Sequence, residues 1–252
     1  MKQHIYGWKH SLPDHRDEIF RFVPKVDLAL PTKVDLRPNN PPIYDQGQEG
    51  SCTANGWARA FEFNLLKENL KDFMPSRQFI YYNERLVEGT LKQGDCGAQV
   101  RTGGKVLNQY GVCPETEWTY IPSHLKTKPH KKEYTDALNN TVIQYSAVTQ
   151  DLIHIKSVLA GGELVVFGIS VYDSFESQEV ASTGKVPMPL PNESCLGGHC
   201  ITLVGYDDSI NCGIVANSWG TSWGLAGYFL LPYAYITSSN LASDFWCINN
   251  VK

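Results

Sequence analysis

Cys52 holds the position in this sequence that best suits a reactive thiol. Apolar side chains recur after it at helical offsets of three and four, at Ala54, Trp57, Ala58, Phe61 and Leu65. With Ser51 as the N-cap, this pattern predicts a helix that runs to about Leu70 and has Cys52 in its first turn. Unpaired backbone N–H groups and the helix dipole stabilise a thiolate there, so we expect its pKa to lie below the ordinary value of about 8.5. The alternative interpretation is a small buried apolar residue.

A nucleophilic thiol needs a base within hydrogen-bond reach, and histidine is the usual one. His199 opens a predicted strand directly after a Gly-Gly pair, where a side chain can face a cleft. The other six histidines lie in polar segments or in a predicted helix, at His4, His10, His15, His124, His130 and His154. Taken alone, His199 is better explained as a hydrogen-bonded structural residue.

Three further residues complete a candidate site. Asn217 lies on the strand predicted after the Asp207-Asp208 turn, so an antiparallel pair of strands would bring its amide oxygen to His199 and fix the ring. Trp219 would shield that hydrogen bond from water. Gln46, in a turn before the helix, would form an oxyanion hole with the backbone N–H of Cys52.

Two halves of different character would position these residues. Helices are predicted around Cys52, from Ser76 to Val87 and from Gln99 to Gln109, the last ended by Gly111. The second half contains β-branched and aromatic runs bounded by glycine or aspartate, at 164–171, 199–206, 213–219 and 227–233. A helical half followed by a strand-rich half predicts an α+β fold with a cleft between two lobes.

Composition excludes several classes of protein. Hydrophobic residues make up 42% and charged residues 19% of the 252 residues, which excludes intrinsic disorder. The net charge is −4 and no long basic tract is present, so we expect no nucleic-acid partner. No apolar run reaches the roughly 18 to 20 residues that span a bilayer, and we expect no membrane partner. The N-terminus lacks the apolar core of a signal peptide, so we expect an intracellular protein or one delivered by a non-classical route.

The number of cysteines, seven, is odd, so at least one thiol is unpaired unless chains are cross-linked. This arithmetic does not identify the unpaired residue. The pairing of the others stays open, and any of them can also be reduced: Cys96, Cys113, Cys195, Cys200, Cys212 and Cys247.

In combination, Gln46, Cys52, His199 and Asn217 resemble the catalytic residues of papain-like cysteine peptidases in order and in spacing. The segments that carry the resemblance are LPTKVDLRP at 30–38, QGQEGSCTANG at 46–56, GGHCITLVGYDD at 197–208 and ANSWGTSWGLAGYF at 216–229. The resemblance implies a papain-like two-lobed fold over 30–252, with a helical lobe at about 40–112, a β-rich lobe at about 113–235 and a C-terminal segment that crosses between them.

The resemblance also implies a thiol peptidase that needs no metal or organic cofactor. Cys52 would attack a peptide carbonyl as a thiolate paired with the His199 imidazolium, and Asn217 would hold the ring. Backbone groups of Gly97 and Ala98 would flank an extended substrate, while Gly168 and Gly198 would shape the main specificity pocket. We expect a monomer acting as an endopeptidase on peptides or proteins.

Two departures from the family pattern stand near the nucleophile. Glu49 takes the place of a cysteine in most members, which removes a disulfide partner and fits a reducing setting. Thr53 takes the place of an aromatic residue. Only residues 1–29 precede the mature-like start, so we expect the family's long pro-segment to be absent. We expect this proline-containing arm to pack near the cleft and partly to limit access to it.

Three other interpretations stay open. One is a catalytically silent family member that binds peptide or protein in the cleft. Another is an acyltransferase or deamidase that applies the same Cys-His-Asn chemistry to a different amide. The third is an exopeptidase, in which the long region from Pro114 to Thr149 closes one end of the cleft and His124 and His130 bind a terminal carboxylate.

Overall fold

The computed structural model describes residues 4–21 and 29–252, so residues 1–3 and 22–28 of the expected arm lie outside it. The strands are β1 (Trp8–Lys9), β2 (Lys33–Asp35), β3 (Ala98–Gln99), β4 (Val142–Ala147), β5 (Val165–Tyr172), β6 (Cys195–Asp207), β7 (Cys212–Ala216), β8 (Tyr228–Pro232) and β9 (Ala242–Val251). The α-helices are α1 (Cys52–Lys67), α2 (Arg77–Val87), α3 (Val100–Gln109), α4 (Lys131–Ala137), α5 (Leu152–Ala160), α6 (Gln178–Thr183) and α7 (Tyr233–Ile236).

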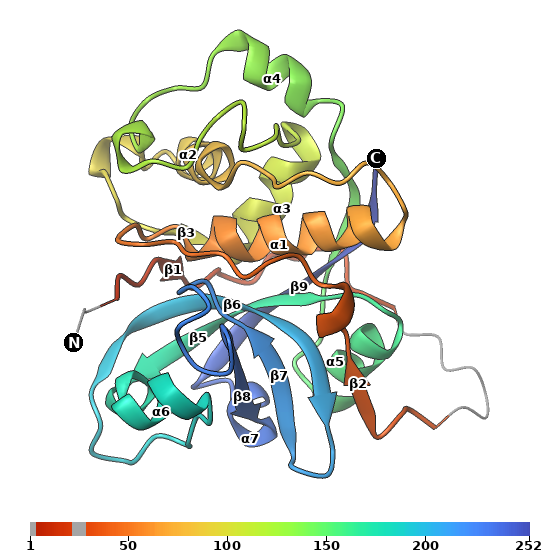
Figure 1. The fold of residues 1–252 in the computed structure, drawn as a ribbon, viewed down its shortest axis with the longest axis vertical. Helices are drawn as coiled ribbons and strands as arrows, with labels where there is room; N and C mark the ends of the chain where they lie inside the picture. The colour runs from red at the N-terminus through yellow and green to blue at the C-terminus, as the bar shows by residue number, and fades with distance from the viewer. Residues whose placement is uncertain (1–3, 22–28) are drawn as a thin grey trace.

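The chain forms the expected α+β fold with a helical lobe and a sheet lobe (Figure 1). Helices α1 to α4 gather in one lobe. Within the described residues, seven strands form the main sheet of the other lobe, in the order β4-β9-β5-β6-β7-β8 with β2 paired to β6. No helix in the described part of the chain is both long and apolar enough to cross a bilayer.

Helix α1 lies between the two lobes and packs closely on the sheet at Gly56. A Cβ atom added there would lie 3.0 Å from Val166 Cγ1 and 3.2 Å from Cys200 Sγ, so a side chain would push the helix away from β5 and β6. The helix ends at Lys67, before the expected Leu70, because Asn69 adopts the left-handed conformation with φ of 54°. This close packing sets the first turn of α1 beside strand β6.

The other two predicted helices are present with small changes at their ends. Ser76 is the N-cap of α2 and its side chain accepts a hydrogen bond from Phe79 N at 3.1 Å. Helix α3 begins at Val100, one residue later than expected, and Gly111 follows it with φ of 68°.

The helical lobe extends further along the chain than the sequence suggested. Cys113, Trp118 and Ala137 form one buried cluster with Phe79 of α2. Ser76 Oγ also donates a hydrogen bond to Trp118 O at 2.6 Å. We expected the β-rich lobe to begin at about 113, whereas residues 113–137 pack on α2, because this segment contributes aromatic side chains to the helical lobe.

Strand β9 belongs to both hydrophobic cores. Trp246, Ile248 and Val251 lie in the core built around α1. Ala242, Phe245 and Cys247, on the same strand, lie in the core of the sheet lobe. The C-terminal segment therefore connects the interiors of the two lobes.

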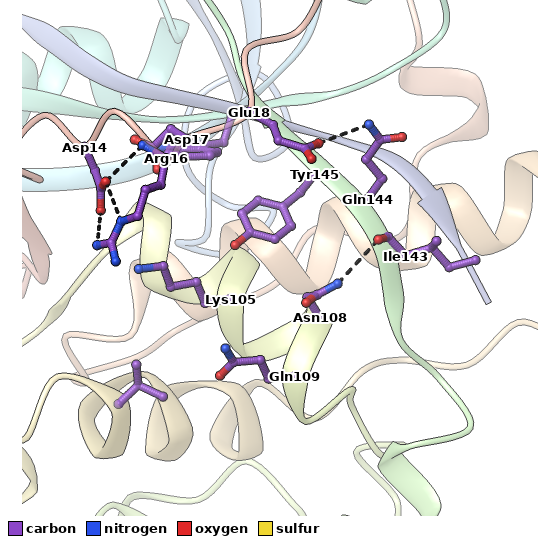
Figure 2. A pocket seen from close by; sticks show the side chains of 12 residues that line it. Asp14, Arg16, Asp17, Glu18, Lys105, Asn108, Gln109, Ile143, Gln144 and Tyr145 are labelled. Carbon is purple, nitrogen blue, oxygen red and sulfur yellow. Dashed lines mark hydrogen bonds and ion pairs between the residues drawn. The ribbon is translucent and has the colours of Figure 1, made fainter.

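The described part of the N-terminal arm crosses from β3 to strand β4. Strand β1 pairs in parallel with β3. Further along, Ala147 N donates to Glu18 O at 2.7 Å and Phe20 N donates to Ala147 O at 2.7 Å. Figure 2 shows this second attachment, where Glu18 reaches Gln144 beside a polar pocket. The arm is thus fastened at both ends of its described length.

Candidate active site

Cys52 is the first residue of α1 and its side chain is fully buried. Burial raises the pKa of the thiol to about 12, and the backbone N–H groups of Cys200 and Gly7 lower it only in part. Our expectation of a depressed pKa was therefore wrong for this state of the protein. The helix N-terminus is present as predicted, but the cost of burying a thiolate outweighs its effect.

Ser51 occupies the predicted N-cap position, but its side chain does not cap the helix. Its hydroxyl instead lies 2.5 Å from the hydroxyl of Tyr120, and Asn55 Nδ2 donates to the Ser51 carbonyl at 3.0 Å. Ser51, which directly precedes Cys52, is thus held by side chains from two directions.

His199 lies on β6 opposite Ile169 of β5, and Asn217 follows directly after the end of β7. Strands β6 and β7 are antiparallel neighbours, as the sequence predicted. Nε2 of His199 lies 2.8 Å from Asn217 Oδ1, and Ser218 N donates to the same oxygen at 2.8 Å. An amide oxygen that accepts from Ser218 accepts from the imidazole as well, so the proton of the neutral ring is on Nε2 and Nδ1 carries the lone pair.

Trp219 covers the histidine ring. The two rings stack with centroids 4.7 Å apart and planes at 20°. Both His199 and Asn217 are buried. Burial lowers the pKa of His199 to about 4, although the hydrogen bond that the ring donates to Asn217 favours the charged form. At neutral pH the thiol of Cys52 and the imidazole of His199 are therefore both uncharged in this state.

Gln46 lies where the sequence placed it, in the loop before α1, and is buried. Ser218 Oγ donates to Gln46 Oε1 at 2.6 Å, which fixes the orientation of the amide. Its Nε2 donates to Glu49 O at 2.9 Å and lies 3.4 Å from Ile5 O. The amide NH₂ group thus faces a carbonyl oxygen of the arm.

The arm contacts the residues of this site in succession. His4 stacks on Trp219 with ring centroids 3.7 Å apart and planes at 2°. Tyr6 presents its ring to that of His199 at 6.5 Å, edge to face. Glu176 binds both arm side chains, accepting from the Tyr6 hydroxyl and lying 2.9 Å from His4 Nδ1.

The four expected substrate-binding residues also contact the arm. Ala98 N donates to Gly7 O at 2.8 Å, and a Cβ atom on Gly97 would lie 2.0 Å from that same oxygen. The Trp8 ring lies against the other two: a Cβ atom would lie 2.0 Å from Trp8 Cε2 at Gly168 and 2.6 Å from Trp8 Cε3 at Gly198. Glycine at these positions is what makes room for the indole.

Three polar residues of the site were missed in the sequence. Glu176 holds His4 and Tyr6, Asp244 Oδ2 accepts from Trp8 Nε1 at 3.0 Å, and Ser218 orients Gln46. Ser218 follows Asn217 in the ANSWG segment, which is the one signal that points to it. Glu176 and Asp244 carry no local pattern, because their partners are more than 150 residues away in the chain.

His124 and His130 lie against Trp118, with ring centroids 4.3 Å and 5.5 Å from the indole. Among residues 4–21 and 29–252, no three histidine, cysteine or carboxylate side chains are placed to hold a metal. All seven cysteines lie in the described residues and carry free thiols.

Glu49 is a buried carboxyl group beside Gln46. It accepts from Gln78 Nε2 at 3.0 Å through one oxygen, while the other oxygen is buried and has no hydrogen-bond partner in the described part of the chain. Burial and, next, the nearby Asp95 carboxylate raise the pKa of Glu49 to about 7. The opposing hydrogen bond from Gln78 and the positive charges of Arg77 and Arg85 do not cancel this shift.

Replacing Glu49 with glutamine is expected to make the stability of the protein less dependent on pH. The unfolded pKa is about 4.5, so the protonated carboxyl stabilises the fold fully below pH 4.5 and loses this contribution as pH rises through 7, by about 3 kcal/mol. Urea unfolding at pH 5 and pH 8 measures the difference. Glu68→Gln, on a side chain that is 49% exposed, is the control. An unchanged pH dependence in Glu49→Gln would contradict the assignment.

The chain matches known proteins over nearly its whole length. The family model described as papain family cysteine protease matches residues 30–247. An uncharacterized peptidase C1-like protein, L477, of Acanthamoeba polyphaga mimivirus is 42% identical over 98% of this chain and 87% of its own length. Cysteine proteinase 1 of Entamoeba histolytica is 27% identical over 81% of this chain and 64% of its own length. The crystal structure of xylellain, a cysteine protease from Xylella fastidiosa, superposes with a TM-score of 0.91 at 42% identity, covering 98% and 96% of the two chains.

Proposed function

Because the chain belongs to the papain family of cysteine proteases, we propose that this thiol peptidase is an endopeptidase whose nucleophile is Cys52 and whose base is His199. The observation that carries the assignment is the hydrogen bond of 2.8 Å between His199 Nε2 and Asn217 Oδ1. Because Nε2 holds the proton, Nδ1 has a free lone pair, and no described residue forms a hydrogen bond with it, as a general base requires.

Catalysis proceeds by two acyl transfers. His199 Nδ1 takes the proton of the Cys52 thiol, and the sulfur forms a bond to the peptide carbonyl carbon. The C–N bond then breaks, and the imidazolium returns its proton to the leaving amine. Water attacks the thioester with His199 again as the base, which releases the carboxylic acid and restores the thiol.

Gln46 supplies part of the oxyanion hole. Its Nε2 is directed at the carbonyl oxygen of Ile5 at 3.4 Å, so this donor faces a space that accommodates a carbonyl oxygen. The backbone N–H of Cys52 is at the free N-terminal end of α1 and supplies a second donor. Both donors would stabilise the negative charge of the tetrahedral intermediate.

Residues 4–8 of the arm are an inhibitory occupant of the cleft. They contact Cys52, His199, Gln46 and the glycines expected to bind substrate, so a peptide cannot bind while they stay in place.

The position of Trp8 supports a preference of the main pocket for aromatic side chains. Gly168 and Gly198 leave space for a flat ring, and Asp244 provides a hydrogen-bond acceptor for its N–H. A substrate with an aromatic side chain that carries a donor meets both features. We expect tryptophan and tyrosine to be favoured in this pocket.

A mixed peptide library, read by mass spectrometry, tests the proposed reaction. The full chain carrying Trp8→Ala, which weakens the arm, is expected to cut peptides at internal bonds near aromatic residues, and the same chain with Cys52→Ala serves as the blank. Removal of terminal residues alone would establish an exopeptidase. Conversion of glutamine or asparagine side chains to acids would establish a deamidase, and binding without cleavage would establish a silent family member.

A further inference from the structure

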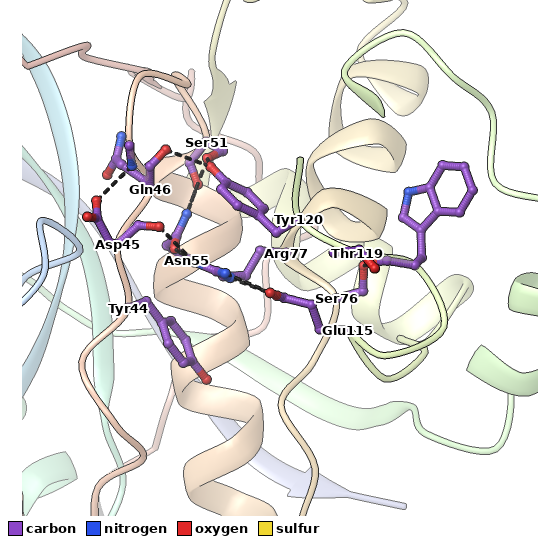
Figure 3. Close-up of polar contacts among 12 residues, drawn as sticks. Tyr44, Asp45, Gln46, Ser51, Asn55, Ser76, Arg77, Glu115, Thr119 and Tyr120 are labelled. Atoms are coloured by element: carbon purple, nitrogen blue, oxygen red, sulfur yellow. Dashed lines mark hydrogen bonds and ion pairs between the residues drawn. The ribbon is translucent and has the colours of Figure 1, made fainter. Parts of the chain in front are cut away.

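Two consecutive carbonyl groups of the loop that carries Gln46 are held by side chains from other parts of the helical lobe. Arg77 Nη1 donates to Asp45 O at 3.0 Å, and the Tyr120 hydroxyl donates to Gln46 O at 2.9 Å. Figure 3 shows the two side chains converging on this loop beside α1. On its other side, Gln46 N donates to Ser218 O at 2.8 Å, so the residue is fixed from both lobes.

Arg77 is itself fixed in place. It is the first residue of α2 and is 6% exposed. Its guanidinium donates to Glu115 through Nε at 2.9 Å and through Nη2 at 2.8 Å. The rings of Tyr120 and Tyr44 lie 4.1 Å and 5.1 Å from its central carbon. A planar fork held by a carboxylate and two aromatic rings has one orientation available to it. Its Nη1 group is thereby directed at Asp45 O of the loop and at Asn55 Oδ1 of α1, which lies 3.1 Å away.

The hydroxyl of Tyr120 also reaches the other half of the oxyanion hole. Its single proton is donated to Gln46 O, so Ser51, whose Oγ lies 2.5 Å away, is the donor to the tyrosine oxygen. Ser51 directly precedes Cys52, whose backbone N–H is the second oxyanion donor. One hydroxyl group therefore connects the Gln46 loop to the start of α1.

We propose that Arg77 and Tyr120 are positioning residues that hold Gln46 and the Cys52 backbone N–H at the spacing the oxyanion requires. This inference rests on the proposed role of Gln46. Donors that stabilise a transition state must be held to within a fraction of an ångström, so loosening them reduces kcat and leaves substrate binding unchanged.

The Tyr120→Phe variant tests the proposal, because phenylalanine retains the ring against Arg77 and removes only the hydroxyl. In the full chain carrying Trp8→Ala, so that the cleft is open, we expect kcat for a peptide substrate to fall about tenfold with KM unchanged. Arg77→Lys, which keeps the charge but not the fork, is expected to have a similar effect. Gln46→Ala alone is expected to lower kcat by about a hundredfold. In that background Tyr120→Phe is expected to cost clearly less than tenfold, because only the Cys52 backbone N–H is then left to be positioned.

Tyr134→Phe is the matched control, since that hydroxyl donates at 2.8 Å to Asn83, away from the Gln46 loop. It is expected to retain full activity. An unchanged kcat in both Tyr120→Phe and Arg77→Lys, or a tenfold loss that persists in the Gln46→Ala background, would overturn the inference. A peptidase activity that survives Cys52→Ala would instead overturn the proposed function on which it rests.

Discussion

Trp8→Ala is expected to increase the rate of alkylation of Cys52 and the value of kcat/KM by about a hundredfold. The substitution removes the indole from between Gly168 and Gly198, together with its hydrogen bond to Asp244. Loss of a packed tryptophan destabilises the closed state, in which the arm covers the cleft, by about 3 kcal/mol. The fraction of molecules with the arm displaced therefore rises about a hundredfold. Iodoacetamide labelling of Cys52, followed by mass spectrometry, measures the first rate.

The same variant is expected to change the pH dependence of labelling. Burial holds the pKa of the Cys52 thiol at about 12 in the covered state, so the labelling rate of the wild type should still be rising with pH at pH 9. When the cleft is open, water hydrates the thiolate and the N-terminus of α1 stabilises its negative charge, so the pKa of the Cys52 thiol falls. The labelling rate of the variant should therefore level off at a lower pH than that of the wild type.

Leu12→Ala provides the matched control for the arm. Leu12 belongs to the same arm but is 78% exposed, so the substitution should change neither rate. Equal labelling rates for the wild type and Trp8→Ala, at every pH, would contradict an inhibitory arm.

Cys52→Ala and His199→Ala are each expected to lower kcat in the open Trp8→Ala chain by at least about a thousandfold. The thiolate forms only when the histidine takes its proton, so the two residues act as a unit. The double variant is therefore expected to be no less active than either single variant. A peptide with a fluorogenic leaving group measures all three rates.

Asn217→Ala should lower kcat less than Cys52→Ala or His199→Ala does. The imidazole ring of His199 keeps its stack on Trp219 when the amide is removed. Losses that multiply in the double variant would show that Cys52 and His199 act independently, which would contradict the proposed acyl transfer. Unfolding midpoints measured in parallel show whether each variant retains the fold.

The sequence predicted the local elements well because their signals are local. The apolar spacing after Cys52 located α1, and Ser76 marked the start of α2. Even the pairing of His199 with Asn217 followed from a short turn between two strands, which leaves few alternatives for their register.

The features that the sequence did not predict depend on distant partners. The pKa of Cys52 was expected to fall, but the arm that buries the thiol is defined by contacts with Glu176 and Asp244, which no local pattern indicates. The lobe boundary was placed too early because the aromatic residues near Trp118 have no regular periodicity, and only their packing on α2 assigns them.

The shared strand β9 makes the two lobes unfold together. Since Trp246 and Phe245 are neighbours in the chain but lie in different cores, releasing one lobe pulls a buried aromatic side chain out of the other. We therefore expect that neither lobe loses its structure without exposing apolar surface in its partner, and that the whole molecule unfolds as one cooperative unit on heating. For the same reason we expect the cleft to open by movement of the arm, with the two lobes still joined.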